Sequence, residues 1–142
     1  MQREVQLPAY DGPRVRVAVA TLKSSGVSEH IAYTVTGILR STLFDTKRFD
    51  VLSPEDMEAV LDLKEINTAC DDTACWADVG LKLGVRKMVT GSIGKLGATF
   101  VITLSLIDVE GVKTEKIVTQ ECRGEEALTR AIRNAGRILC LP

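Results

Sequence analysis

The sequence predicts an α/β fold, a single three-layer domain with a mixed sheet, in the element order β-α-β-α-α-β-β-β-α. Strand and helix patterns alternate over the first half of the chain, whereas three strand patterns follow one another in the second half. The length of 142 residues, with 45% hydrophobic and 26% charged residues, is typical of one globular domain. We therefore expect an extended arm at residues 1–13 and one domain at residues 14–142.

The first half of the domain is expected to alternate strands and helices. Its first strand carries valine at every second position, and the helix that follows has Glu29, Thr36 and Arg40 on its polar side. Ser53 followed by Pro54 and two acidic residues is typical of a helix start. The patterns place a strand at about 14–21, a loop at 23–26, a helix at about 28–46, a strand at 49–52, a helix from Ser53, a loop at 67–73 and a helix at about 74–83.

The second half predicts three consecutive strands and a last helix. Glycine-containing turns at 94–97 and 110–111 separate the strands, and the third strand is the most polar, as an edge strand usually is. The strands are expected at 87–93, 99–109 and 114–122, and the helix at about 125–139.

Composition excludes several classes of function. The formal net charge is −1, so a bulk electrostatic partner such as nucleic acid is not expected. Six aromatic residues and a single histidine disfavour a base-stacking surface and a histidine-rich metal site. No apolar run approaches the roughly 20 residues of a membrane span, so we expect none in this chain.

Motifs for catalysis or a cofactor are not found. Residues 91–97 are rich in glycine and contain a lysine, but they lack the P-loop spacing and join two predicted strands. The single histidine, His30, has no nucleophile at a suggestive spacing, and no G-x-S-x-G elbow occurs. We therefore expect no catalytic residue, no cofactor and no bound metal.

The four cysteines favour one disulfide. Cys70 and Cys75 are five residues apart in a predicted loop, and a bridge between them is the preferred interpretation. A zinc site would need further ligands, for which Cys122, Cys140 and His30 are the candidates. The last helix spans about 22 Å between Cys122 and Cys140, too far for a bridge between those two. Four cysteines in so short a chain suit an oxidising compartment.

Three arginines mark one side of the last helix. Arg130, Arg133 and Arg137 fall opposite its apolar stripe. This is either a solvated helix face or a surface for a protein partner, because arginine is enriched at interfaces.

Several segments share a recognisable order of strand, helix and glycine turn, namely Val17–Ala20, Leu39–Leu43, Arg48–Leu52, Leu83–Ile93 and Leu106–Val109 with Gly111. Together they resemble the CsgG/LpoB/TolB N-terminal-like domains of the bacterial cell envelope, over about residues 14–138. The loop from Cys70 to Cys75 resembles a subgroup of these domains with two cysteines at this place.

The resemblance implies a three-layer α/β domain without catalysis, in a periplasmic protein or an outer-membrane lipoprotein whose targeting segment is absent from this chain. Its function would be non-enzymatic interaction in cell-envelope assembly or secretion, with an envelope protein of unknown identity or a second copy of the chain as partner. The alternative is a regulatory domain that binds a small ligand or a nucleotide in the crevice beyond the strand ends.

Overall fold

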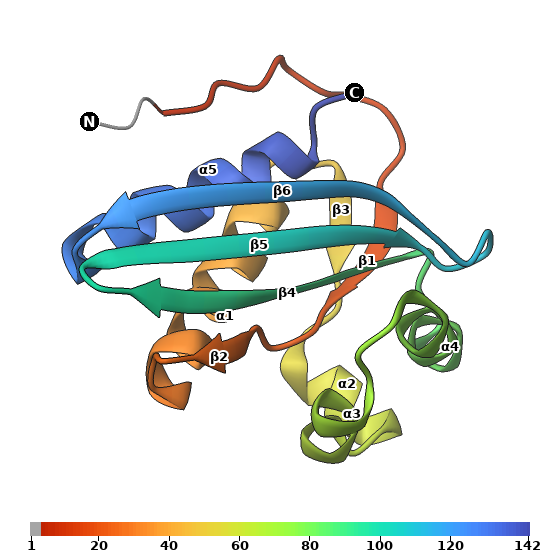
Figure 1. Cartoon of the computed structure of the whole chain (residues 1–142). Helices are drawn as coiled ribbons and strands as arrows, with labels where there is room; N and C mark the ends of the chain where they lie inside the picture. Colours follow the sequence, from red (N-terminus) through yellow and green to blue (C-terminus); the bar gives the residue numbers. More distant parts are fainter. Residues whose placement is uncertain (1–3) are drawn as a thin grey trace.

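A mixed sheet of six strands lies between two groups of helices in the computed structural model (Figure 1), which describes residues 4–142 apart from the side chains of residues 63 and 64. The predicted α/β class is confirmed, and the predicted element order roughly matches. Residues 1–3 of the predicted arm lie outside the described residues. The elements are β1 (Val15–Val19), β2 (Lys23–Ser25), α1 (Glu29–Asp45), β3 (Phe49–Val51), α2 (Pro54–Val60), α3 (Leu63–Ala69), α4 (Thr73–Leu83), β4 (Lys87–Leu96), β5 (Thr99–Asp108), β6 (Lys113–Arg123), a 3-10 turn (Glu125–Ala127) and α5 (Leu128–Leu139).

The strand order is β3-β1-β4-β5-β6. β1 is parallel to both of its neighbours, β3 and β4, whereas β4, β5 and β6 form an antiparallel meander. β2 pairs with the second half of β4, so it continues the line of β1 along the same side of β4 after a break at residues 20–22. The parallel half follows from the helical crossovers, and the antiparallel half follows from short turns.

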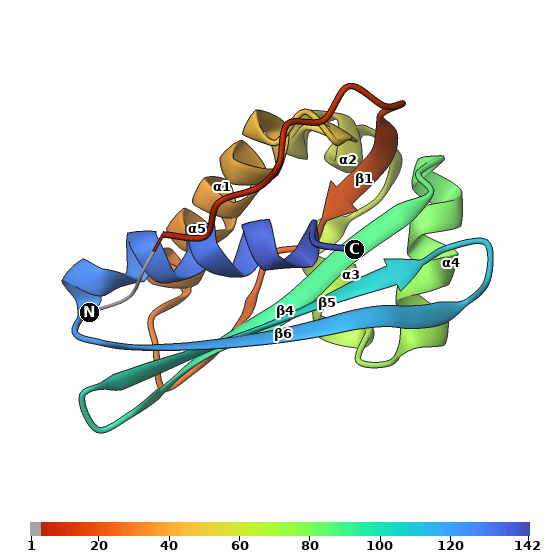
Figure 2. The same cartoon turned by 90° about the horizontal axis from the view of Figure 1, so that it is seen from above.

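Two hydrophobic cores lie on the two faces of the sheet. α1 and α5 cover one face, and α4 covers part of the other (Figure 2). β1 contributes to both cores, because Val17 and Val19 pack under α1 while Ala18 packs toward α4, and all three are fully buried.

Side-chain caps fix the helix starts. The Ser28 and Ser53 hydroxyls accept from the backbone N–H groups of Ile31 and Asp56, and the helix start predicted at Ser53 is confirmed. α4 ends at Gly84, whose φ of 72° is in the left-handed region that favours glycine.

Three local expectations were wrong. The predicted loop at 23–26 contains β2, because pairing with β4 outweighs the low strand propensity of Lys-Ser-Ser. α3 occupies part of the predicted loop at 67–73, and Asp62 caps its start. The turn expected at 94–97 lies at residues 97–98 instead, because β4 stays paired with β5 as far as Leu96.

The expected polar side of α1 was also partly wrong. Thr36 is fully buried, and its Oγ1 accepts from the Leu22 N–H at 3.0 Å and donates to the Ala32 carbonyl at 2.7 Å. Arg40 is half-buried and donates from Nη2 to the Val19 carbonyl at 2.9 Å. Both side chains satisfy backbone groups around the break between β1 and β2, where β4 supplies a partner only for the Ala20 N–H among the hydrogen bonds of the described residues, through the Val89 carbonyl.

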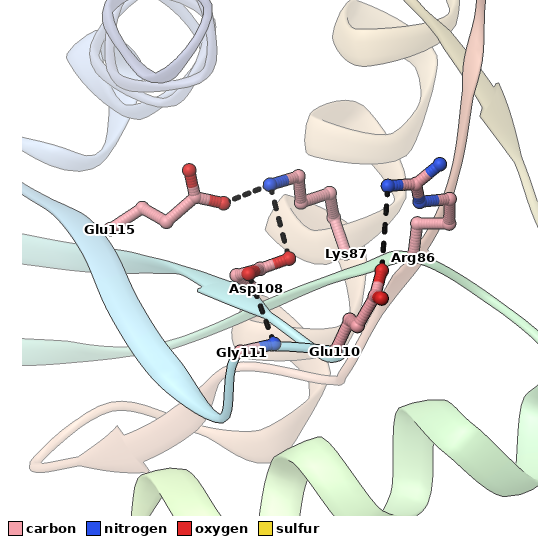
Figure 3. A network of polar contacts seen from close by, with 6 residues as sticks. All are labelled: Arg86, Lys87, Asp108, Glu110, Gly111 and Glu115. Carbon is pink, nitrogen blue, oxygen red and sulfur yellow. Dashed lines mark hydrogen bonds and ion pairs between the residues drawn. The ribbon is translucent and has the colours of Figure 1, made fainter.

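An ion network joins the strand ends near the β5–β6 turn (Figure 3). Lys87 pairs with Asp108 at 3.4 Å and with Glu115, and the Gly111 N–H donates to Asp108 at 3.1 Å. Burial alone would raise the pKa of the Asp108 carboxyl, but Lys87, the Gly111 N–H and the nearby Lys113 outweigh it and hold the pKa below its ordinary value of 3.8.

Alanine substitutions at two helical glycines should change the free energy of unfolding in opposite directions. A Cβ at Gly80 would lie 2.5 Å from Val109 Cγ2 and 2.9 Å from Met88 Cγ, so Gly80→Ala should lower the free energy of unfolding by about 1–3 kcal/mol. A Cβ at the exposed Gly37 would meet nothing within 4 Å, so Gly37→Ala should raise it by about 0.5–1 kcal/mol. Urea unfolding of both variants measures this. Stabilisation by Gly80→Ala would show that α4 does not pack against the sheet as described.

The Asp108 network predicts loss of stability in acid. Because the folded pKa lies below the unfolded value, the contribution is present above the unfolded pKa and is lost as pH falls through the folded pKa. In urea unfolding, the stability difference between the wild type and Asp108→Asn should be constant above about pH 5 and should shrink as the pH falls through 3.8 and below. Glu110→Gln is the control, because Glu110 is 84% exposed and lies 3.7 Å from Arg86, and it should change little. A pH-independent difference for Asp108→Asn would contradict the network.

Candidate partner surface on α5

α5 separates a buried side from an arginine side. Arg130 and Arg133 are exposed and Arg137 is half-buried, on the side that faces away from the sheet. The arginine side therefore lies at the surface of the domain, and its role as a partner surface stays a prediction. The residues that face the core are Leu128, Ala131, Ile132, Ala135 and Leu139.

The N-terminal arm runs along α5 (Figures 1 and 2). The backbone N–H of Val5 donates to Oδ1 of Asn134 at 2.9 Å, and Asn134 is only 2% exposed. Nη2 of Arg48, which follows α1, donates to the Pro8 carbonyl at 2.9 Å, and its guanidinium lies 5.0 Å from the centre of the Tyr10 ring. Asn134 on α5 and Arg48 thus both bind main-chain groups of the arm.

Hollows remain on both sides of the arm. The first, of about 760 Å³, lies between the arm, the C-terminal end of α1 and α5. The second, of about 710 Å³, lies between α5 and the end of β6. Arg133 and Arg137 line both hollows. We call the first hollow, together with Asn134 and the track that the arm occupies, the α5 groove.

The α5 groove has an excess of positive charge. Lys47, Arg48, Arg133 and Arg137 line it, whereas Glu4 and Asp45 are its carboxylates. In the part of the chain that the structure describes, neither Arg133 nor Arg137 forms an ion pair. The groove can therefore accept carboxylate groups from outside the chain, and arginine can do so with two parallel hydrogen bonds.

None of the four cysteines is among the residues that line the first hollow. A disulfide joins Cys70 and Cys75, whose Cα atoms are 5.5 Å apart, next to the start of α4 in the opposite helical layer. Cys122 and Cys140 are free thiols at the two ends of the last helical segment. Burial raises the pKa of both thiols, with Glu126 adding to the rise at Cys122.

Other candidate chemistry is not brought together. Within residues 4–142, excluding the two side chains noted above, no three His, Cys, Asp or Glu residues form a group that could hold a metal ion. His30 lies exposed on α1. None of the helices in the described residues has the length and apolar character needed to cross a membrane.

Sequence reasoning missed the docking of the arm and the roles of Asn134 and Arg48. The available signal was Asn134 itself, a polar residue between Ile132 and Ala135 on the apolar side of a helix. A buried polar side chain needs a hydrogen-bond partner, and here the arm supplies it.

No family model matches the chain, and no curated protein matches its sequence. Solved structures do share its fold. The C-terminal domain of LpoB from Escherichia coli has a TM-score of 0.61 at 12% identity and covers 80% of this chain and 87% of that chain. Lipoprotein GNA1162 from Neisseria meningitidis has a TM-score of 0.62 at 11% identity, covering 79% and 83%. A PelC dodecamer from Paraburkholderia phytofirmans has a TM-score of 0.56 at 15% identity, covering 96% and 91%.

At these identities the likeness shows the fold alone. The LpoB part of the expected resemblance is supported at that level, as is the TolB part, since TolB from Acinetobacter baumannii matches with a TM-score of 0.55 at 15% identity, over 90% of this chain and 27% of that chain. The CsgG part stays a prediction.

The cysteine arrangement predicts a definite thiol count. Without reductant, the denatured chain should react with a thiol reagent at two cysteines, and after reduction at all four. In the native protein both free thiols should react slowly, because their raised pKa values leave little thiolate at neutral pH. Mass spectrometry after alkylation counts the labels. Four labels before reduction, or a linked Cys122–Cys140 peptide pair, would contradict the arrangement.

Proposed function

We propose that this chain is a non-enzymatic interaction domain of the bacterial cell envelope that docks an extended, acidic segment of a protein partner in the α5 groove. The observation that carries the proposal is the arm, an extended segment already held there through its main chain by Asn134 and Arg48. Contacts to main-chain groups do not depend on the sequence of the segment, so another extended segment can make them.

The excess positive charge of the groove favours a partner segment with negative charge. Four cations face two carboxylates along its walls, and Arg133 is exposed. An acidic segment would therefore gain favourable ion pairs with groups that are already close together, whereas a basic segment would meet repulsion. The binding should weaken with salt, because the groove is open to solvent.

The cell envelope is proposed as the location on two grounds. The fold is shared with LpoB and with a meningococcal lipoprotein, and the Cys70–Cys75 disulfide suits an oxidising compartment. Docking of a segment needs shape, charge and hydrogen bonds, all of which the groove offers, and it needs no catalytic group.

Self-association is the second candidate. It is favoured by the arm, which shows that a segment of this same sequence fits the groove, and by the likeness in fold to a protein solved as a dodecamer. In this version the arm of another copy occupies the groove, an exchange of the kind seen in domain swapping.

Weakening the arm in the intact chain tests the docking proposal. Val5→Pro removes the N–H that donates to Asn134. It should therefore strengthen binding of a labelled synthetic peptide with the sequence of residues 4–12, measured by fluorescence anisotropy. A peptide with Gln6 replaced by Glu should bind more tightly than the parent peptide, and the gain should shrink with salt.

Two matched variants control the measurement. Arg133→Gln should weaken peptide binding several-fold. Arg86→Gln should not, because Arg86 is an exposed arginine just before β4, pairs with Glu110 at 3.7 Å and does not line the groove. Peptide binding that both variants leave unchanged would refute the groove as the site. If light scattering shows oligomers that dissociate in Val5→Pro, the occupant is the arm of a second copy.

A further inference from the structure

The arm is held in the α5 groove at two main-chain points that are three residues apart. The Val5 N–H donates to Asn134 Oδ1 at 2.9 Å, and the Pro8 carbonyl accepts from Arg48 Nη2 at 2.9 Å. A guanidinium donates and cannot accept, so the second point needs a carbonyl, and proline offers a carbonyl without an N–H. The two points together fix the register of the segment along the groove.

The side chains around these points alternate in exposure. Val5 and Leu7 are half-buried, whereas Glu4 and Gln6 are exposed. Successive side chains of an extended chain point to opposite sides, so Val5 and Leu7 face the domain and Gln6 faces solvent. An apolar side chain therefore gains burial at the two inward positions and not at the position between them.

Pro8 restricts the shape of the segment before it binds. Its ring fixes its own φ, and it keeps the preceding Leu7 out of the helical region. A segment with proline at this position is therefore already extended, and it loses less conformational entropy when it enters the groove.

The ring of Tyr10 makes the next side-chain contact. Its centre lies 5.0 Å from the Arg48 guanidinium, within the range of a cation–π contact. The arm itself orients the ring, because the Tyr10 hydroxyl donates to the Pro13 carbonyl at 2.6 Å. The groove thus offers a cation to an aromatic residue two positions after the proline.

Glu4 carries a carboxylate at the other end of the segment. It lines both hollows, as do Arg133 and Arg137. A carboxylate at this position is therefore favoured by the two guanidinium groups that border the same spaces.

We infer that the α5 groove recognises a linear motif in its partner, namely an acidic residue followed by apolar, any, apolar, proline, any and aromatic residues. The arm carries this motif from Glu4 to Tyr10. The inference rests on the proposed docking function and names the class of partner, a protein with an extended segment that has this order of residues. Because the arm is a copy of the motif within the chain, the partner segment must displace it.

Variants of a peptide with the sequence of residues 4–13 test the motif. Binding to the full Val5→Pro chain, in which the arm is weakened, is measured by fluorescence anisotropy. Leu7→Ser in the peptide should raise the Kd about five-fold or more, because an inward apolar contact is lost. Ala9→Ser is the matched control at an exposed position and should change the Kd by less than about two-fold. A peptide with the same residues in scrambled order should bind about ten-fold more weakly or worse.

A double-mutant cycle tests the aromatic position. Tyr10→Leu in the peptide should weaken binding about two- to five-fold. Arg48→Met in the Val5→Pro chain should abolish the discrimination between these two peptides, because the cation that contacts the ring is gone.

The outcomes separate the motif from the docking function. If the scrambled peptide binds as tightly as the parent, the motif is overturned and the docking function stands, since charge and main-chain contacts then suffice. Discrimination between the Tyr10→Leu peptide and the parent that survives Arg48→Met would also overturn the motif as described. If no peptide binds, both the docking function and the motif are overturned.

Discussion

The last three residues of β1 are buried on both faces of the sheet, and the rest of the structure depends on this constraint. Val17 and Val19 fill the core under α1 and α5, and Ala18 fills the core under α4. A strand in this position needs a neighbour on each side and a helical layer above and below. β3 and β4 supply the neighbours, and the crossovers through α1 and through α2 to α4 supply the layers.

The break between β1 and β2 and the α5 groove both follow from this arrangement. Pairing along β4 is interrupted between β1 and β2, and there the Leu22 N–H and the Val19 carbonyl bind Thr36 and Arg40 of α1. On the other face, α5 completes the core with its apolar side and leaves the arginine side outward. Asn134 sits where the two sides meet, and the arm covers it.

The sequence predicts well the elements that have a regular residue pattern or a local chemical cause. It predicts poorly those that form only through contacts with distant parts of the chain. The caps at Ser28 and Ser53 and the stop at Gly84 have local chemical causes, so they were predictable. β2 was not, because three polar residues become a strand only through pairing with β4. The arginine side of α5 could be predicted from spacing, whereas the α5 groove could not, since it needs the arm, the end of α1 and α5 together.

The central claim is that the α5 groove holds an extended segment through its main chain. Amide hydrogen exchange at Val5 tests it most directly, because the Val5 N–H is the group that donates to Asn134. The account predicts that this amide exchanges more slowly than that of the exposed Gln6, and that Asn134→Ala in a folded chain abolishes the difference. Equal, rapid exchange at Val5 and Gln6 in the wild type would contradict the account.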